Sequence, residues 1–189
     1  MTISLNQRLQ GTNLYLVGMM GAGKSTTGRT LAQALGYRFF DTDGVAVAAA
    51  GQSIPQIFEH QGEAAFRQLE TAVLAQLSAY RRLVVATGGG IVTQPQNWSY
   101  LHHGIVVWLD VPLELLQQRL AGDRQRPLLQ QPDWPATLAD LWAQRQPLYA
   151  QADIQVTVGP GDRTAAVSDR ILALVDQRIR PPLPSAELN

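Results

Sequence analysis

Residues 18–25 read GMMGAGKS, in which glycines recur ahead of a lysine and a hydroxyl side chain. In a loop of this pattern the backbone N–H groups turn toward phosphates, the lysine reaches the β- and γ-phosphates, and the hydroxyl binds magnesium. An apolar run at 14–17 precedes the loop and helical spacing follows it, so the positive end of a helix also favours phosphate there. The pattern predicts a P-loop that binds a nucleoside triphosphate. The residues expected to hold the nucleotide phosphates are Gly21, Ala22, Gly23, Lys24, Ser25 and Thr26.

Two carboxylates occur in the segment FFDTD at 39–43, at the end of a second apolar run. In open α/β sheets this carboxyl edge is where ligands bind. Asp41 and Asp43 are one residue apart, so on an extended chain they point in opposite directions and should have different roles. A purely structural interpretation remains open, in which Asp43 caps a helix over 45–50 and Asp41 only ends a strand.

An arginine, a glutamate and three glycines follow. Arg67 and Glu70 share one face of a predicted helix over 63–77, where such a pair is most often a surface ion pair. Gly88, Gly89 and Gly90 follow an apolar run at 83–86 after a single threonine. Glycines at the end of a strand allow the backbone to approach a ligand closely. The alternative is a flexible turn.

Arginines gather later in the chain. Arg126 lies in RPLL at 126–129 and Arg145 in RQPLY at 145–149, and both follow Arg119 and Arg124. Each alone could be an ordinary surface residue, but together they form the arginine-rich part of a chain that contains a phosphate site. The surrounding segment 122–135 has no regular period and contains three prolines. A long irregular loop in a compact domain is either an exposed connection or a lid over an active site.

Short apolar runs alternate with amphipathic stretches along the chain, which is typical of a parallel sheet covered by helices. Strands are predicted over 13–17, 38–40, 83–86, 105–109 and 154–158. Helices are predicted over 24–35, 63–77, 113–120, 136–149 and 164–177. We therefore expect one α/β domain over 11–178, with mobile tails at 1–10 and 181–189.

The composition limits the classes of function. The 189 residues carry a formal net charge of zero, so no overall field attracts nucleic acid or an anionic membrane. The absence of cysteine excludes disulfides, thiolate catalysis and cysteine metal sites. The apolar runs are too short to span a bilayer, and residues 1–10 lack the apolar core of a signal peptide. These features predict a soluble cytoplasmic protein, and a monomer is the simplest expectation.

Taken in order, the motifs resemble those of the shikimate kinase family. The matching elements are GMMGAGKST at 18–26, DTD at 41–43, FRQLE at 66–70, GGG at 88–90, RPLL at 126–129 and RQPLY at 145–149. The resemblance covers residues 14 to about 175. It implies a P-loop NTPase fold like that of nucleoside monophosphate kinases, with three layers and a five-stranded parallel sheet in the order 2-3-1-4-5. It also implies a substrate-binding region over about 44–70 and a lid over about 122–134.

The resemblance further implies that ATP and Mg²⁺ are used and that the 3-hydroxyl of shikimate accepts the γ-phosphoryl group. Asp43 would contact the shikimate hydroxyls, and Gly88, Gly89 and Gly90 would offer their backbone. Arg67 and Arg145 would hold the carboxylate, because planar guanidinium groups match it in two hydrogen bonds. The resemblance also assigns the nucleotide contacts: Arg126 would contact the phosphates, and Arg119 and Arg163 would contact adenine. Ser25 would bind magnesium directly, and Asp41 would bind it through water.

Two alternatives remain open at this point. One is a P-loop kinase for another small acceptor, such as gluconate or a nucleoside monophosphate. Nucleoside monophosphate kinases of the adenylate type carry glycine after the P-loop lysine, whereas Ser25 follows Lys24 in this chain. The other is a nucleotide-binding regulator without turnover. The presence of all the charged residues that the family motif requires speaks against this alternative.

Overall fold

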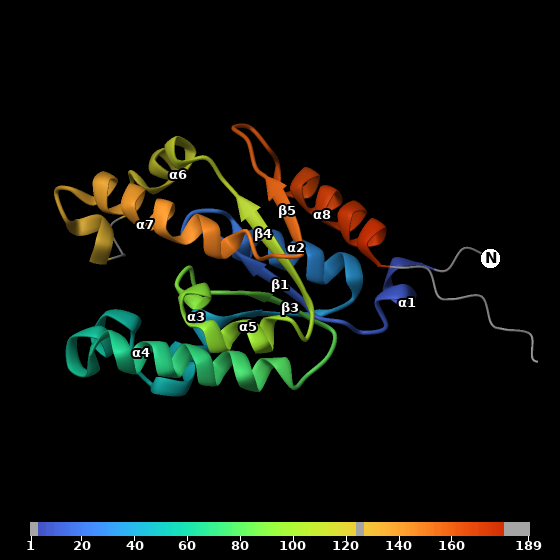
Figure 1. The fold of residues 1–189 in the computed structure, drawn as a ribbon, viewed down its shortest axis with the longest axis horizontal. Coiled ribbons are helices and arrows are strands. Elements are labelled where there is room, and N and C mark those ends of the chain that lie inside the picture. The colour runs from blue at the N-terminus through green and yellow to red at the C-terminus, as the bar shows by residue number, and fades with distance from the viewer. Residues whose placement is uncertain (1–3, 124–126, 180–189) are drawn as a thin grey trace, which may run out of the picture.

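The computed structural model describes residues 4–123 and 127–179 of the chain (Figure 1). At its centre lies a parallel sheet of five strands in the order β2-β3-β1-β4-β5. The strands are β1 (Leu14–Val17), β2 (Arg38–Asp41), β3 (Leu83–Ala86), β4 (Ile105–Asp110) and β5 (Ile154–Thr157). The predicted α/β class and strand order are confirmed, and each predicted strand agrees with the structure to within one residue at either end.

Helices cover both faces of the sheet, which gives three layers (Figure 1). Helix α2 (Lys24–Leu35) packs against α8 (Thr164–Arg178) on one face, and α4 (Ile54–Ser78) packs against α5 (Pro95–Leu101) on the other. The remaining helices are α1 (Leu5–Leu9), α3 (Thr42–Ala50), α6 (Leu113–Leu120) and α7 (Trp134–Tyr149), with short 3₁₀ turns η1 (Ile91–Thr93) and η2 (Pro127–Gln130).

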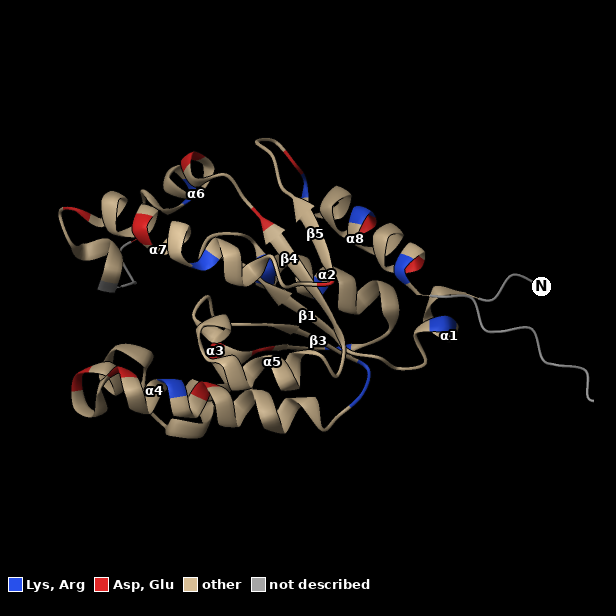
Figure 2. Cartoon of the chain, viewed as in Figure 1, with Lys and Arg blue, Asp and Glu red and all other residues tan. Residues whose placement is uncertain are grey.

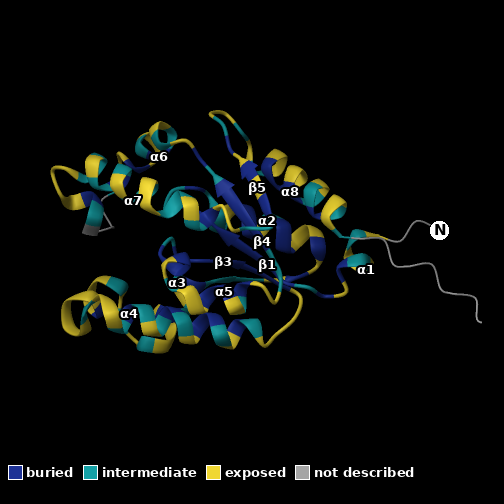
Figure 3. Ribbon diagram, viewed as in Figure 1, coloured by how far each residue is buried: buried dark blue, intermediate teal, exposed yellow. Residues whose placement is uncertain are grey.

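The core follows from this layering, because the central strands of a parallel sheet covered on both faces are apolar at nearly every position. All four residues of β1 and of β3 are buried, and Figure 3 shows the central strands as the most buried part of the molecule. Each fully buried Leu, Val or Ile contributes roughly 1.5–3 kcal/mol of transfer free energy. The apolar runs of the sequence are therefore both the sheet and the main source of stability.

The register of the sheet brings the candidate site segments to one edge. Leu16 in β1 and Asp41 in β2 both pair with Ala86 in β3. The P-loop, the two aspartates and the glycines 88–90 therefore all emerge from the carboxyl edge of the sheet within a few residues of each other. This is the edge at which open α/β sheets bind ligands.

Helix α4 begins at Ile54, nine residues before the predicted start. Ser53 caps it, with the Gln56 side chain returning to the Ser53 backbone N–H as the second half of a capping box. The helix is interrupted at Gly62, which has φ 80° and ψ 173° and so adopts a conformation that essentially only glycine tolerates. Because of this break, the apolar positions before Gly62 do not continue the apolar stripe after it. The periodicity therefore did not predict the first two turns of the helix.

The segment 1–10, expected as a tail, contains helix α1. Ser4 and Gln7 form a capping box at its start, Leu9 is buried, and Arg8 forms an ion pair with Asp176 of α8. Helix α5 and turn η1 were also not predicted. The tail 181–189 lies outside the described residues, as does part of the lid region. Within the described ranges, no helix is both long and apolar enough to cross a membrane.

Candidate active site

The P-loop joins β1 to α2 with three glycines in conformations that L side chains rarely adopt. Gly18, Gly21 and Gly23 have φ values of 139°, 78° and 91°, and Gly23 is the N-cap of α2. The Nζ atom of Lys24 donates hydrogen bonds to the carbonyl oxygens of Gly18 and Met19, both at 2.8 Å. The ammonium group is thereby held over the loop at the start of α2, where the helix dipole also favours a phosphate group.

Ser25 and Asp41 meet next to this loop. The Ser25 hydroxyl donates to Oδ2 of Asp41 at 2.5 Å, while Oδ1 of Asp41 accepts from the backbone N–H of Asp43 at 3.1 Å. Asp41 is thus the N-cap of α3. The structural alternative for Asp43 was therefore wrong, because α3 begins at Thr42 and places Asp43 in its first turn. The two acids have different neighbours, and because β2 ends at Asp41, strand alternation is not what separates them.

A cavity of about 680 Å³ lies at this edge of the sheet. It is lined by residues from the P-loop, from the β2–α3 junction and from the segment after β3, including Lys24, Ser25, Asp41, Asp43, Gly88 and Gly89. The cavity therefore joins the predicted phosphate residues to the predicted acceptor residues. Arg67 does not line it, but borders a separate cavity of about 550 Å³ beside Glu63 and Gln68.

Gly88 lies where two carboxylates converge. A Cβ atom on Gly88 would lie 2.5 Å from Oε1 of Glu70 and 2.7 Å from Oδ1 of Asp43, so a side chain there would displace one or both acids. The backbone N–H of Gly88 donates to the buried hydroxyl of Thr42 at 2.9 Å. The glycine is thus required by close packing, and the three glycines are not merely a flexible turn.

Glu70 is almost fully buried and forms an ion pair with Arg67 at 2.5 Å. Burial raises the pKa of the Glu70 carboxyl above its usual range, and the charge of Asp43 adds to the rise, while Arg67 and Arg145 oppose it. The pair is therefore buried and not the surface ion pair that the i, i+3 spacing alone suggested. Glu63 holds the other side of the Arg67 guanidinium, with Nη2 to Oε1 at 2.9 Å. Sequence reasoning assigned no role to Glu70, although its place in FRQLE was the available signal.

Arg67 and Arg145 approach the glycines 88–90 from different helices. The position of a Cβ on Gly90 would overlap the Arg67 guanidinium, and that of a Cβ on Gly89 would lie 3.6 Å from Nη1 of Arg145. In Figure 2, helices α4 and α7 each carry basic and acidic residues, and charges of both signs are spread over the described part of the chain. The two guanidinium groups thus border one three-residue segment.

A second cavity, of about 200 Å³, adjoins the outer side of the P-loop. Gly21, Thr26, Arg119 and Asp162 are among the residues that line it. Arg119 also donates to the carbonyl oxygen of Gly21 at 3.2 Å, and its contact with adenine stays a prediction. Arg163 does not line this cavity and is instead the N-cap residue of α8. Its predicted contact with adenine stays a prediction.

Arg126 and the neighbouring Arg124 lie outside the described residues, so the structure does not place them. Within the described part of the lid region, Pro127–Gln130 form η2 and Leu129 is buried. The lid and the phosphate contact of Arg126 therefore stay predictions.

Taken together, the fold and this cavity define a P-loop kinase for a small molecule: a triphosphate loop and an acceptor pocket share one cavity. The family model described as shikimate kinase matches residues 20–176. The chain is 56% identical over 179 residues to the shikimate kinase of Thermosynechococcus vestitus, with 95% of this chain and 98% of that protein covered. The chain belongs to the shikimate kinase family, and it is an ATP-dependent kinase.

Solved structures agree with this assignment. The shikimate kinase of Acinetobacter baumannii, solved in complex with shikimate, is 42% identical and superposes with a TM-score of 0.84, covering 92% of this chain and 98% of that one. A gluconokinase from Sinorhizobium meliloti shares the fold alone, at 16% identity and a TM-score of 0.58, with 89% of this chain and 94% of that one covered. The expected P-loop NTPase fold, like that of nucleoside monophosphate kinases, is thereby confirmed, and family membership argues against the gluconate alternative.

Proposed function

We propose that this kinase transfers the γ-phosphoryl group of ATP to the 3-hydroxyl of shikimate, giving shikimate 3-phosphate and ADP. The observation that carries the proposal is the shared cavity, in which Lys24 and Ser25 face the same space as Asp43 and Gly88. Phosphoryl transfer has a loose transition state, so positioning and charge stabilisation supply most of the catalysis. A single cavity lined by both donor and acceptor residues supplies both.

On the donor side, the P-loop N–H groups and Lys24 hold the β- and γ-phosphates. Ser25 and Asp41, already hydrogen-bonded to each other, are the residues that would hold Mg²⁺. Among the described residues, no group of three or more acidic or histidine side chains could enclose a metal ion. This fits Mg²⁺, which keeps several waters and is bound through one or two protein groups and the substrate phosphates. When bound, the ion neutralises charge on the phosphate oxygens.

On the acceptor side, Asp43 orients the hydroxyl that attacks and takes its proton late in the transfer. An ordinary aspartate, with a pKa of about 3.9, is a weak base for an alcohol, so orientation is the larger part of this role. Arg67, Arg145 and the backbone of Gly88, Gly89 and Gly90 hold the carboxylate and ring of the acceptor. Glu70 supports this arrangement by fixing the Arg67 guanidinium.

The nucleotide base would occupy the smaller cavity beside Arg119, and Arg126 would complete the phosphate contacts from the lid. These roles, together with a monomeric state and a cytoplasmic location, rest on the sequence and the family resemblance.

A coupled assay of ADP release tests the proposal, with Mg²⁺ and ATP present and shikimate, gluconate or no acceptor added. We expect release that depends on shikimate and is saturable in it. Release stimulated by gluconate but not by shikimate would assign a different acceptor. Release that no acceptor stimulates would contradict the proposal and support a regulator.

A further inference from the structure

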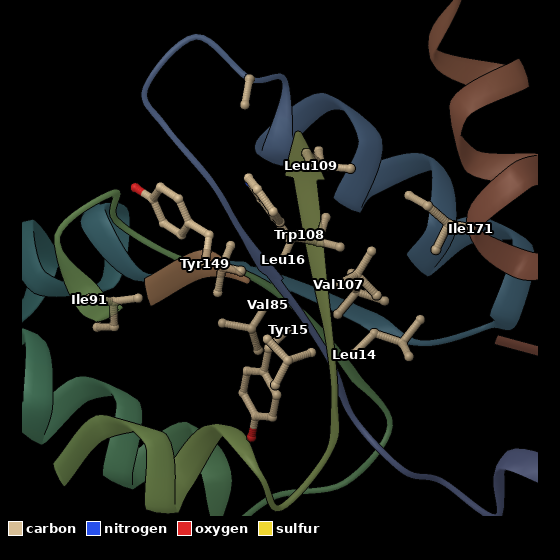
Figure 4. Packing of buried hydrophobic residues seen from close by; sticks show 14 of the residues in the cluster. Leu14, Tyr15, Leu16, Val85, Ile91, Val107, Trp108, Leu109, Tyr149 and Ile171 are labelled. Carbon is tan, nitrogen blue, oxygen red and sulfur yellow. The ribbon is translucent and has the colours of Figure 1, made fainter. Parts of the chain in front are cut away.

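Tyr149, the last residue of α7, lies between the two halves of the site although it does not line the main cavity. The side chain is 1% exposed, and its ring stacks on Trp108 of β4 with centroids 6.0 Å apart. Figure 4 shows Tyr149 reaching into the core beside Trp108. A tyrosine buried this deeply needs a partner for its hydroxyl, and the identity of that partner indicates what the residue does.

The Tyr149 hydroxyl donates a short hydrogen bond, 2.6 Å, to the carbonyl oxygen of Gly89. Burial raises the pKa of Tyr149 to about 12, so the phenol keeps its proton and remains a donor throughout the physiological range. The same oxygen lies 3.5 Å from Sδ of Met19 in the P-loop. One hydroxyl thus joins α7, the glycine segment and the P-loop.

The bond to Gly89 fixes the orientation of the next peptide group. The described residues contain no cis peptide bond, so the Gly90 N–H points away from the Gly89 carbonyl and hence away from Tyr149. Within the described ranges, neither the Gly89 nor the Gly90 N–H donates a hydrogen bond to a protein atom. Both N–H groups thus have no protein acceptor among the described residues, and Arg67 and Arg145 border this segment, with Gly90 buried against Arg67.

Arg145 lies beside the same glycine. It precedes Tyr149 by four residues on α7, and its charge opposes the rise in the Tyr149 pKa. A Cβ atom on Gly89 would lie 3.6 Å from Nη1 of Arg145, so this guanidinium lies next to the peptide that the phenol holds. Removing the Tyr149 hydroxyl would release the Gly89 carbonyl while leaving the aromatic packing in place.

We propose that Tyr149 is a positioning residue: it holds the Gly89–Gly90 peptide, next to the Arg145 guanidinium, in the orientation in which this peptide binds the carboxylate of the acceptor. This inference rests on the proposed function, in which shikimate supplies that carboxylate. It assigns no chemical step to Tyr149 and predicts a selective effect on acceptor binding.

The test compares Tyr149→Phe with the wild type and with Tyr15→Phe. Tyr15 is a matched control because it is also fully buried, and its hydroxyl pairs with Asn13 at 3.3 Å within the core. We expect Tyr149→Phe to raise the KM for shikimate about 5- to 30-fold, the effect of leaving a buried carbonyl unpaired. The KM for ATP should stay unchanged, and Tyr15→Phe should change neither KM.

Wild-type turnover is measured first, so that a failure of the proposed function can be distinguished from a failure of the positioning role of Tyr149. No turnover with shikimate overturns the proposed function itself. Normal wild-type turnover with an unchanged shikimate KM in Tyr149→Phe, or with equal rises in both KM values, overturns the positioning role alone.

A second measurement needs no variant. Shikimate added to ¹⁵N-labelled wild-type protein should shift the amide resonance of Gly90. An unshifted Gly90 resonance at saturating shikimate would contradict the proposal.

Discussion

Asp43 is held in the first turn of α3 with its carboxylate against Gly88, on the acceptor side of the shared cavity. Asp43→Asn keeps the size of the side chain but removes its charge and its ability to take a proton. We expect kcat to fall by about 10²–10⁴, the usual cost of losing an acid–base group. Steady-state kinetics with ATP and shikimate measure it, and turnover close to that of the wild type would remove Asp43 from the mechanism.

The two guanidinium groups make a paired prediction. A lysine keeps the charge but cannot form two parallel hydrogen bonds with a carboxylate, so Arg67→Lys and Arg145→Lys should each weaken shikimate binding and leave ATP binding largely intact. Arg67→Lys should also lower stability more than Arg145→Lys, because Arg67 is the ion-pair partner of the buried Glu70. Calorimetric titration of each ligand separates these effects. A selective loss of ATP affinity would mean that the acceptor pocket is misplaced.

Glu70 allows a prediction about pH. Its pKa is higher in the folded protein than the ordinary value of 4.5, so the folded state holds the proton more tightly than the unfolded state does. This contribution to stability is complete below pH 4.5 and is lost as the pH rises through the raised pKa. The free energy of unfolding of the wild type, relative to Glu70→Gln, should therefore decrease over that range. Denaturant unfolding of both proteins at a series of pH values measures this difference in the free energy of unfolding. A difference that increases with pH would contradict the raised pKa of Glu70.

At the scale of elements, the turn after β3 makes the sharpest prediction. A methyl group on Gly88 would lie within 2.7 Å of both Glu70 and Asp43, whereas one on Gly89 would lie 3.6 Å from its nearest neighbours. Gly88→Ala should therefore destabilise the protein more than Gly89→Ala, by the roughly 1–3 kcal/mol typical of overpacking. Thermal unfolding of the two variants compares them. Equal stabilities would mean that this turn is looser than the structure shows.

The elements also show which features the sequence could predict. The five strands and helix α2 were predictable because buried parallel strands read as apolar runs and the helix has regular apolar spacing. Helix α5 was not, since it has seven residues and too few turns to establish a period. The start of α4 was hidden by the break at Gly62, and α1 by its brevity.

The residues of the site were only partly predictable from the sequence. Motif spacing identified the P-loop, Asp43 and the glycines, and the structure places the P-loop, Asp43, Gly88 and Gly89 around one cavity. The burial of Glu70 and the hydrogen bond from Tyr149 to Gly89 depend on packing between elements far apart in the chain. Neither periodicity nor local spacing contains that information. The N-cap of α3 is Asp41, two residues before the Asp43 of the structural alternative, and a difference of this size is within the uncertainty of a predicted helix boundary.

At the scale of the whole molecule, the central claim is that the two halves of the cavity serve one transfer from ATP to a particular hydroxyl. The parallel sheet makes this possible because β1, β2 and β3 end at the same edge and bring the P-loop, Asp43 and Gly88 together. The most direct measurement is ³¹P and ¹H NMR of the product formed from Mg²⁺, ATP and shikimate. We expect one new phosphate ester, with phosphorus coupled to the proton on carbon 3 and with ADP formed in equal amount. An ester at another hydroxyl, or ADP formed together with free phosphate and no ester, would contradict the account.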